Sequence, residues 1–228
     1  MKQPKRFLIF DAGPIISLSM NGLLYVIEKL RKDFDGDFVI TPRVKKEVVD
    51  RPLGIKKYEL EALRVKDLLD KKVLRVASDF VSANAIEKET KRILKSANSL
   101  FSAEGEKINL IQEADASCLA FSRLCGVENL IVVDERTTRM LTEAPENLRK
   151  IMSSRLHTSI KVKIENLKEL EGFKFIRSAE VVYIAYKKGL INLEKSKQLL
   201  DALLYGLKFK GTAISSQEID VILGVGGC

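Results

Sequence analysis

The chain has 228 residues, of which 46% are hydrophobic and 31% charged, a composition typical of a globular protein and unlike that of a disordered one. Its formal net charge is +8, and the spread of basic residues along the chain favours a basic surface on a folded domain over a disordered nucleic-acid-binding tail. A single histidine and three cysteines without a Cys-x-x-Cys pair argue against a zinc site and against a histidine-dependent catalytic arrangement.

The sequence carries no sign of membrane insertion or export. No apolar stretch approaches the length that spans a bilayer, and the first apolar run is too short for the core of a signal peptide. We therefore expect a cytoplasmic protein. Cys118 and Cys125 fall in a helical pattern and are expected in the core, while Cys228 is the last residue. Any chemistry is expected to depend on carboxylates.

The first apolar run, Phe7–Phe10, has no alternation, which indicates a strand covered on both faces in a parallel α/β sheet. It ends on Asp11, and Gly13-Pro14 leads into a helix expected over 15–31, with Asn21-Gly22 weakening its middle. Asp11 would then lie at the carboxyl end of a central strand, where open α/β sheets bind their ligands. The alternative is a helix N-cap or turn aspartate without further function.

A second strand is expected at 38–40, with Thr41-Pro42 as N-cap and first position of a helix over 43–50. Glu47 follows Val44 by three residues, so it projects beside the apolar stripe of that helix instead of opposite it. The following pattern predicts a helix over 56–70, a strand at 73–76, a helix over 79–95 and a polar loop over 96–106.

The next helix is expected over 108–124, closed by Gly126. Glu113 and Asp115 are two residues apart, about 200° around a helix, so they cannot share a face. Small and apolar neighbours make Asp115 the expected inward acid and Glu113 the expected solvent-facing one. A further apolar strand at 130–133 also ends on acids, Asp134-Glu135.

Two strands that end on acids and two helices that carry inward-leaning acids predict a cluster of carboxylates. Such a cluster is costly unless a cation compensates it. Oxygen ligands without histidine or thiolate select Mg²⁺ or Mn²⁺. A site of this kind suits phosphodiester hydrolysis.

Four segments together resemble the PIN-domain nucleases. The similar segments, which run from about Phe7 to Leu141, are FDAGPIISL, TPRVKKEVVD, EADASCLAF and LIVVDERTTRML. The resemblance implies a three-layer α/β/α sandwich around a mainly parallel sheet. It also implies a metal-dependent endoribonuclease that leaves 5′-phosphate and 3′-hydroxyl ends. The implied catalytic residues, which are also the implied ligands of one or two Mg²⁺ or Mn²⁺ ions, are Asp11, Glu47, Asp115 and Asp134.

The chain departs from the family pattern at three places. Gly13 stands where many members have serine, threonine or asparagine two residues after the first acid, so a group that could orient water is lost. Alignment at the fourth acid leaves Glu135 as an alternative to Asp134. The segment between Val76 and Asp115 is also longer than in compact members.

We expect a nuclease domain over 1–150 and a mostly helical C-terminal extension over 151–228, packed on the same domain. Within the extension the pattern predicts a strand in 157–165 and helices over 179–188, 193–207 and 215–223. The extension resembles the C-terminal end of a PIN subgroup without a settled function. It is a candidate for a homodimer or RNA surface.

RNA is the partner that the resemblance implies, and the net charge of +8 permits a polyanionic partner. The candidate RNA-binding residues are Lys88, Lys91, Arg92, Lys95, Arg136 and Arg139. A glycine fingerprint for a dinucleotide is absent from the sequence, and Gly13 occupies the position of the second aspartate of a dehalogenase-type phosphatase. Two alternatives stay open: a non-catalytic RNA-binding or scaffold PIN domain, and, within the nuclease interpretation, a toxin with an antitoxin partner or an RNA-processing enzyme.

Overall fold

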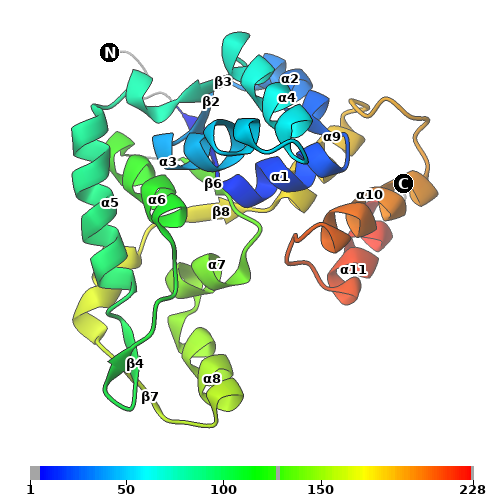
Figure 1. Ribbon diagram of the computed structural model, residues 1–228. Helices are drawn as coiled ribbons and strands as arrows, with labels where there is room; N and C mark the ends of the chain where they lie inside the picture. The colour runs from blue at the N-terminus through cyan, green and yellow to red at the C-terminus, as the bar shows by residue number, and fades with distance from the viewer. Residues whose placement is uncertain (1–5, 127–128, 227–228) are drawn as a thin grey trace.

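The computed structural model describes residues 6–126 and 129–226. Its centre is a five-stranded sheet of order β3-β2-β1-β6-β8, in which every neighbouring pair is parallel. Helices flank this sheet, so the expected α/β class and three-layer sandwich are confirmed (Figure 1). The strands of the sheet are β1 (Phe7–Phe10), β2 (Asp37–Ile40), β3 (Leu74–Val76), β6 (Leu130–Val132) and β8 (Lys174–Ile176).

The register of the central strands determines where the acids can meet. All four residues of β1 are buried, as a strand covered on both faces requires. Phe10 pairs with Ile40 of β2 and with Val132 of β6. The three strands therefore end together, and Asp11 and Asp134 leave the same edge of the sheet.

The helices form two groups around the sheet. α5 and α6 pack together, with α6 against β1 and β6, whereas α1 and α2 contact each other and both contact α4 and α9. The helices are α1 (Ala12–Met20), α2 (Leu24–Asp33), α3 (Pro42–Lys45), α4 (Glu59–Asp70), α5 (Ala83–Ala97), α6 (Glu113–Cys125), α7 (Arg136–Glu143), α8 (Pro145–Leu156), α9 (Ser178–Lys187), α10 (Lys197–Phe209) and α11 (Ser216–Gly226). Short helical turns are the π-helical η1 (Lys46–Asp50) and the 3₁₀ turns η2 (Pro52–Gly54), η3 (Ala77–Asp79) and η4 (Ile164–Leu170).

Several local expectations differ from the structure. The single helix expected over 15–31 is two helices, because Gly22 adopts a φ of 69° and ends the first. The loop expected over 96–106 contains β4 (Phe101–Ala103) and β5 (Glu106–Lys107), which pair with each other and, through β4, with β7 (Ile160–Val162). The turn between β4 and β5 has positive φ at both central residues, Glu104 and Gly105, as two-residue hairpins prefer.

The C-terminal third is integrated with the rest of the chain. β8 completes the central sheet beside β6, and α9 contacts α1 and α2. The domain boundary expected at residue 150 falls inside α8. Figure 1 shows α10 and α11 on one side of the molecule, with α7, α8 and the small sheet extending below the central sheet. Among residues 6–126 and 129–226 no helix is both long and apolar enough to cross a membrane; Cys228 lies outside those ranges.

Candidate functional site

Asp11 lies at the end of β1 and at the N-cap position of α1, yet its side chain makes no capping hydrogen bond. The residue is only 8% exposed, and Oδ1 has no hydrogen-bond partner among the described residues. The pKa of Asp11 is raised to about 7, mainly by burial and then by the charge of Asp115. The Ala12 and Gly13 amides lower the pKa, and the charge of Glu47 raises it a little further. An ordinary capping aspartate would have its oxygens occupied.

Asp115 stands in the first turn of α6 and is 6% exposed. Its Oδ1 accepts a hydrogen bond of 2.8 Å from the Thr138 hydroxyl of α7, and its Oδ2 accepts one of 3.0 Å from the Gln112 amide. Each bond leaves further acceptor capacity on its oxygen. Asp115 is therefore held in place between two helices and can still bind a ligand.

Glu47 lies on the π-helical turn η1, an arrangement that often marks functional positions. It is half-buried. Burial raises the pKa of Glu47, Arg51 lowers it, and the charges of Asp115 and Glu113 raise it further. Glu47 is thus an electrostatic neighbour of Asp115, as Asp11 is.

Glu113 is exposed and bound to a cation outside the cluster. Its Oε2 accepts a hydrogen bond of 2.6 Å from Arg43 on α3, and the same guanidinium binds Glu87 of α5 at 2.8 Å. Arg43 therefore compensates Glu113, whereas Asp11 and Asp115 form no ion pair with a described residue in the structure.

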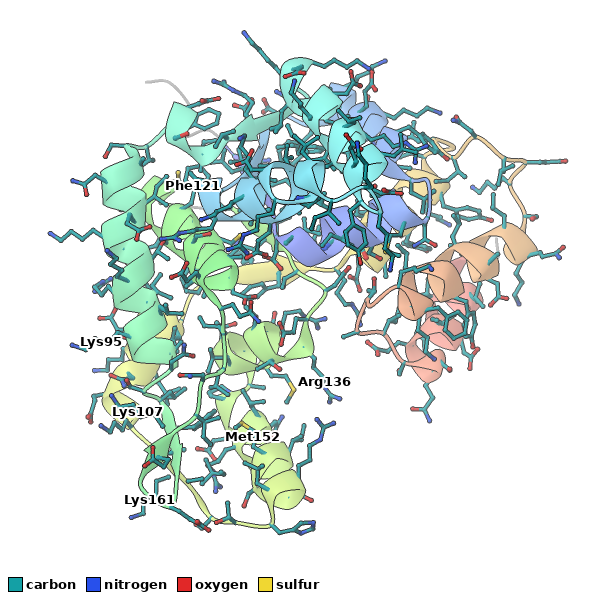
Figure 2. The ribbon with its side chains drawn as sticks, viewed as in Figure 1. Lys95, Lys107, Phe121, Arg136, Met152 and Lys161 are labelled. Atoms are coloured by element: carbon teal, nitrogen blue, oxygen red, sulfur yellow. The ribbon has the colours of Figure 1, made fainter. Side chains whose placement is uncertain are left out.

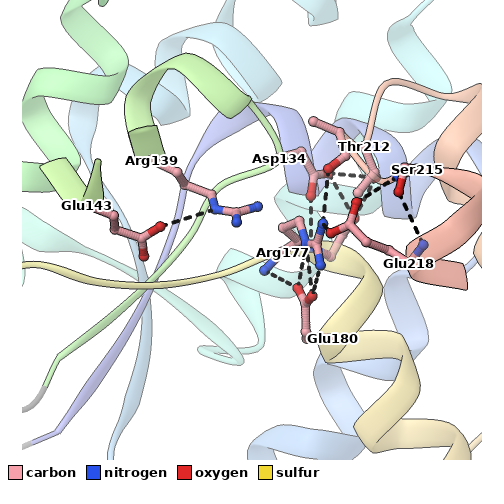
Figure 3. Close-up of polar contacts among 10 residues, drawn as sticks. Asp134, Arg139, Glu143, Arg177, Glu180, Thr212, Ser215 and Glu218 are labelled. Carbon is pink, nitrogen blue, oxygen red and sulfur yellow. Dashed lines mark hydrogen bonds and ion pairs between the residues drawn. The ribbon is translucent and has the colours of Figure 1, made fainter. Parts of the chain in front are cut away.

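The Asp134 carboxylate is directed toward the C-terminal third of the chain, as Figure 3 shows. It is 3% exposed. It accepts hydrogen bonds of 2.8 Å from both the Ser178 amide and the Ser178 hydroxyl, and one of 3.0 Å from the Thr212 hydroxyl. Burial raises the pKa of Asp134, these bonds oppose that rise, and Glu180 adds to it. Asp134 is thus used to bind α9 and the segment before α11.

Glu135, the alternative to Asp134, is oriented differently. The residue is exposed. Partial burial of its carboxylate and then the charge of Asp115 raise the pKa of Glu135, whereas a hydrogen bond from Thr137 lowers it. The charge of Asp115 therefore acts on three acids: Asp11, Glu47 and Glu135. We call these four residues the acid cluster.

The acid cluster can be compared with the needs of a divalent cation. Across residues 6–126 and 129–226, no three His, Cys, Asp or Glu side chains are already arranged to hold a metal ion. The donors nevertheless suit Mg²⁺ or Mn²⁺, since Asp11 Oδ1 is buried without a partner and every ligand is a carboxylate. The neighbouring Cys118 is fully buried, and burial raises the pKa of its thiol, so it stays neutral. The residues present fit a hard cation.

The candidate RNA-binding residues differ in how far they are already neutralised. On α5, Lys91 pairs with Glu87 at 3.4 Å, and Arg92 pairs with Glu89 and Glu169. Lys88 and Lys95 are exposed and form no ion pair with a residue of the described ranges. On α7, Arg139 approaches Glu143 only at 4.0 Å, and Arg136 contacts the sulfur of Met140 at 3.2 Å.

Sequence reasoning did not identify three residues that fix the acids. Thr138 binds Asp115, and Ser178 and Thr212 bind Asp134. Thr138 follows the predicted strand end by a few residues, so its proximity to the site could have been expected. Ser178 and Thr212 are 44 and 78 residues from Asp134, and no local pattern indicates such contacts.

Comparison with known proteins adds no relative: no protein-family model, curated protein or solved structure matches the chain.

Proposed function

We propose that the chain is a PIN-type endoribonuclease that hydrolyses RNA phosphodiester bonds with one or two Mg²⁺ or Mn²⁺ ions bound by the acid cluster. One observation supports this most strongly. One carboxylate oxygen of Asp11 is buried without a hydrogen-bond partner among the described residues. Burial and the charge of Asp115 also raise the pKa of Asp11 to about 7. A folded protein rarely leaves such an atom unpaired without a functional reason.

The proposed ligands are Asp11, Glu47, Asp115 and Glu135, with Asp134 in a positioning role. Asp134 already accepts three hydrogen bonds, whereas Glu135 is exposed and influenced by Asp115. When bound there, a divalent cation supplies activation of water and stabilisation of the charge that develops on phosphate.

The side chains contribute the placement of charge. Thr138 and the Gln112 amide fix the orientation of Asp115, so its oxygens are preorganised. The Arg43 pair holds Glu113 to one side, which limits the negative charge at the cluster. Asp134, through its contacts to Ser178 and Thr212, fixes the backbone that carries Glu135. Products with 5′-phosphate and 3′-hydroxyl ends are what the family resemblance implies.

A second candidate is a non-catalytic RNA-binding or scaffold PIN domain. Two observations favour it. Asp134, the fourth acid of the family pattern, accepts hydrogen bonds from Ser178 and Thr212. Among the described residues, no three His, Cys, Asp or Glu side chains are already arranged to hold a metal ion. In that case the acid cluster would be a remnant, and the basic surface would carry the function.

Cleavage of labelled RNA separates the two candidates. Single-stranded and structured RNAs are incubated with Mg²⁺, Mn²⁺ or EDTA and with wild type, Asp11→Asn or Glu113→Gln. Asp11→Asn should lower the rate by about 100-fold or more, because it removes a ligand charge. Glu113→Gln is the matched control, since it removes a carboxylate charge from the same helix as Asp115 but outside the cluster, and it should leave activity within a few-fold of wild type.

The result distinguishes enzyme from scaffold directly. Cleavage by wild type that EDTA stops and Asp11→Asn abolishes supports hydrolysis at the acid cluster. Equal RNA binding by wild type and Asp11→Asn, with cleavage by neither, would support the scaffold. Cleavage that survives Asp11→Asn would exclude the proposed site.

A further inference from the structure

A groove of about 630 Å³ lies between α7–α8 and the segment that leads into α11. Its walls come from both the nuclease-like part and the C-terminal third of the chain. Figure 3 shows Arg139 on α7 and Arg177 before α9, both of which line it. The polar residues of the lining are Arg136, Arg139, Asn147, Arg177, Ser215 and Glu218.

The wall of the groove that α7 and α8 form belongs to a basic stretch of the chain. Residues 136–163 contain seven basic and two acidic residues, a net charge of +5, while the whole chain carries +8. A surface of this kind attracts polyanions.

The two arginines of α7 remain available to an anion. The Arg136 side chain contacts the sulfur of Met140, and Arg139 forms a long ion pair of 4.0 Å with Glu143. Figure 2 places Arg136 on the side of α7 that faces α10 and α11. An exposed ion pair at 4.0 Å contributes little, so both guanidinium groups could exchange their present contacts for phosphate oxygens.

Arg177 has a different task in the same groove. Its guanidinium binds Glu180, Glu218 at 2.6 Å and the Ala213 carbonyl at 3.1 Å. Burial alone would raise the pKa of Glu218, but the Ser215 amide and Arg177 lower it to about 2. Glu218 is therefore charged at neutral pH, and the Arg177–Glu218 pair fixes the C-terminal wall.

The groove adjoins the acid cluster through α7. Glu135 immediately precedes Arg136, and Thr138, between the two arginines, donates its hydrogen bond to Asp115. Arg136 and Arg139 are three residues apart and share a helix face, whereas Thr138 lies on another. One short helix thus presents cations to the groove and a hydroxyl to the acids.

We propose that this groove binds the phosphodiester backbone of single-stranded RNA next to the acid cluster, and that the C-terminal third forms its second wall. This inference rests on the proposed function, because it names the substrate form that reaches the site. The volume of the groove is within the roughly 300–1,000 Å³ of small-ligand pockets, which suits one or two nucleotides of a single strand.

The test is fluorescence anisotropy with a 5′-labelled 12-nucleotide single-stranded RNA, in EDTA so that cleavage cannot interfere. Wild type is compared with Arg136→Gln/Arg139→Gln. The matched control is Arg64→Gln/Lys32→Gln, which removes the same charge from two exposed basic residues that neither line the groove nor belong to residues 136–163. The groove variant should bind at least about tenfold more weakly, and the slope of log Kd against log salt should fall by about 1.4 for two lost phosphate contacts. The control should stay within about threefold of wild type.

Asn147→Asp gives a second test without removing an arginine. Asn147 is exposed on α8 and lines the groove, so the change adds a negative charge there while leaving the core untouched. It should weaken RNA binding several-fold. A duplex of the same sequence should bind more weakly than the single strand to wild type.

Several results would overturn the inference. Equal losses in the groove variant and the control would mean that overall charge alone binds RNA. A second overturning result concerns an eight-residue polyglutamate peptide. If the groove variant binds RNA as tightly as wild type but no longer binds this peptide, the groove binds an acidic protein partner and not RNA. If wild type cleaves RNA but the groove variant binds normally, the groove fails and the nuclease proposal stands. If the groove variant loses RNA binding and neither wild type nor the variant cleaves RNA, the groove is an RNA-binding site and the nuclease proposal fails.

Discussion

Asp134 and Glu135 are consecutive residues whose carboxylates belong to different parts of the molecule. Asp134 is buried and accepts three hydrogen bonds from Ser178 and Thr212. Glu135 is exposed, and the charge of Asp115 raises its pKa. One acid therefore holds the C-terminal third in place, and the other is available to the acid cluster.

Substitution of Asp134 should lower stability, whereas substitution of Glu135 should lower activity. Asp134→Ala leaves buried hydroxyl and amide donors unpaired and should lower the free energy of unfolding by roughly 3 kcal/mol. Glu135→Gln changes an exposed side chain and should leave that free energy within about 0.5 kcal/mol of wild type, while RNA cleavage falls steeply. Urea unfolding and the cleavage rate measure the two effects. A Glu135→Gln protein with wild-type activity would assign the ligand role to Asp134 instead.

Stability without metal should depend on pH through Asp11. The pKa of Asp11 is about 7 in the fold against an ordinary value of 3.8, so between these values the folded state binds more protons than the unfolded chain. The contribution of Asp11 is therefore fully present below pH 3.8, is lost as pH rises through about 7 and is constant above that. The loss is on the order of 4 kcal/mol at about 1.36 kcal/mol per pKa unit.

Asp11→Asn isolates this contribution. In EDTA the variant should be more stable than wild type at pH 8, and the difference should shrink toward pH 4. Denaturant unfolding at several pH values gives the difference between the two proteins, in which the titration of acids that do not interact with Asp11 cancels. A difference that stays constant from pH 4 to pH 8 would contradict the raised pKa of Asp11.

Gly13 is a position where the chain can be stabilised. It lies in the first turn of α1 and is exposed, and a Cβ added there would stand 3.8 Å from Asp134 Cβ and 3.9 Å from Asp11 Oδ2. These are ordinary contacts. Gly13→Ala should therefore raise the free energy of unfolding by roughly 0.5–1 kcal/mol. Thermal unfolding checks this, and a lowered melting temperature would show that the backbone there needs glycine.

The central strands and two of the acids could be predicted from the sequence. The continuous apolar runs at 7–10 and 130–133 indicate strands covered on both faces, as the central strands of a parallel α/β sheet are. Asp11 follows from the first run. Asp115 follows from its small and apolar neighbours on α6, because such residues pack closely against a sheet.

The assignment between Asp134 and Glu135 could not be predicted. It depends on Ser178 and Thr212, which reach Asp134 from 44 and 78 residues away, and no local pattern carries that information. β8 was not predicted either, since it has three residues and none is fully buried. Its pairing with β6 is decided by the sheet edge and not by its own sequence.

The central claim is that the acid cluster binds a divalent cation through Asp115 and its neighbours. Calorimetric titration of metal-free protein with Mn²⁺ tests this most directly, with wild type, Asp115→Asn and Glu113→Gln in parallel. Glu113 is two residues from Asp115 and is paired with Arg43, so it controls for general charge loss on the same helix. We predict saturable binding by wild type and Glu113→Gln, and its loss in Asp115→Asn. Absence of binding by wild type at millimolar Mn²⁺, or unchanged binding by Asp115→Asn, would contradict the claim.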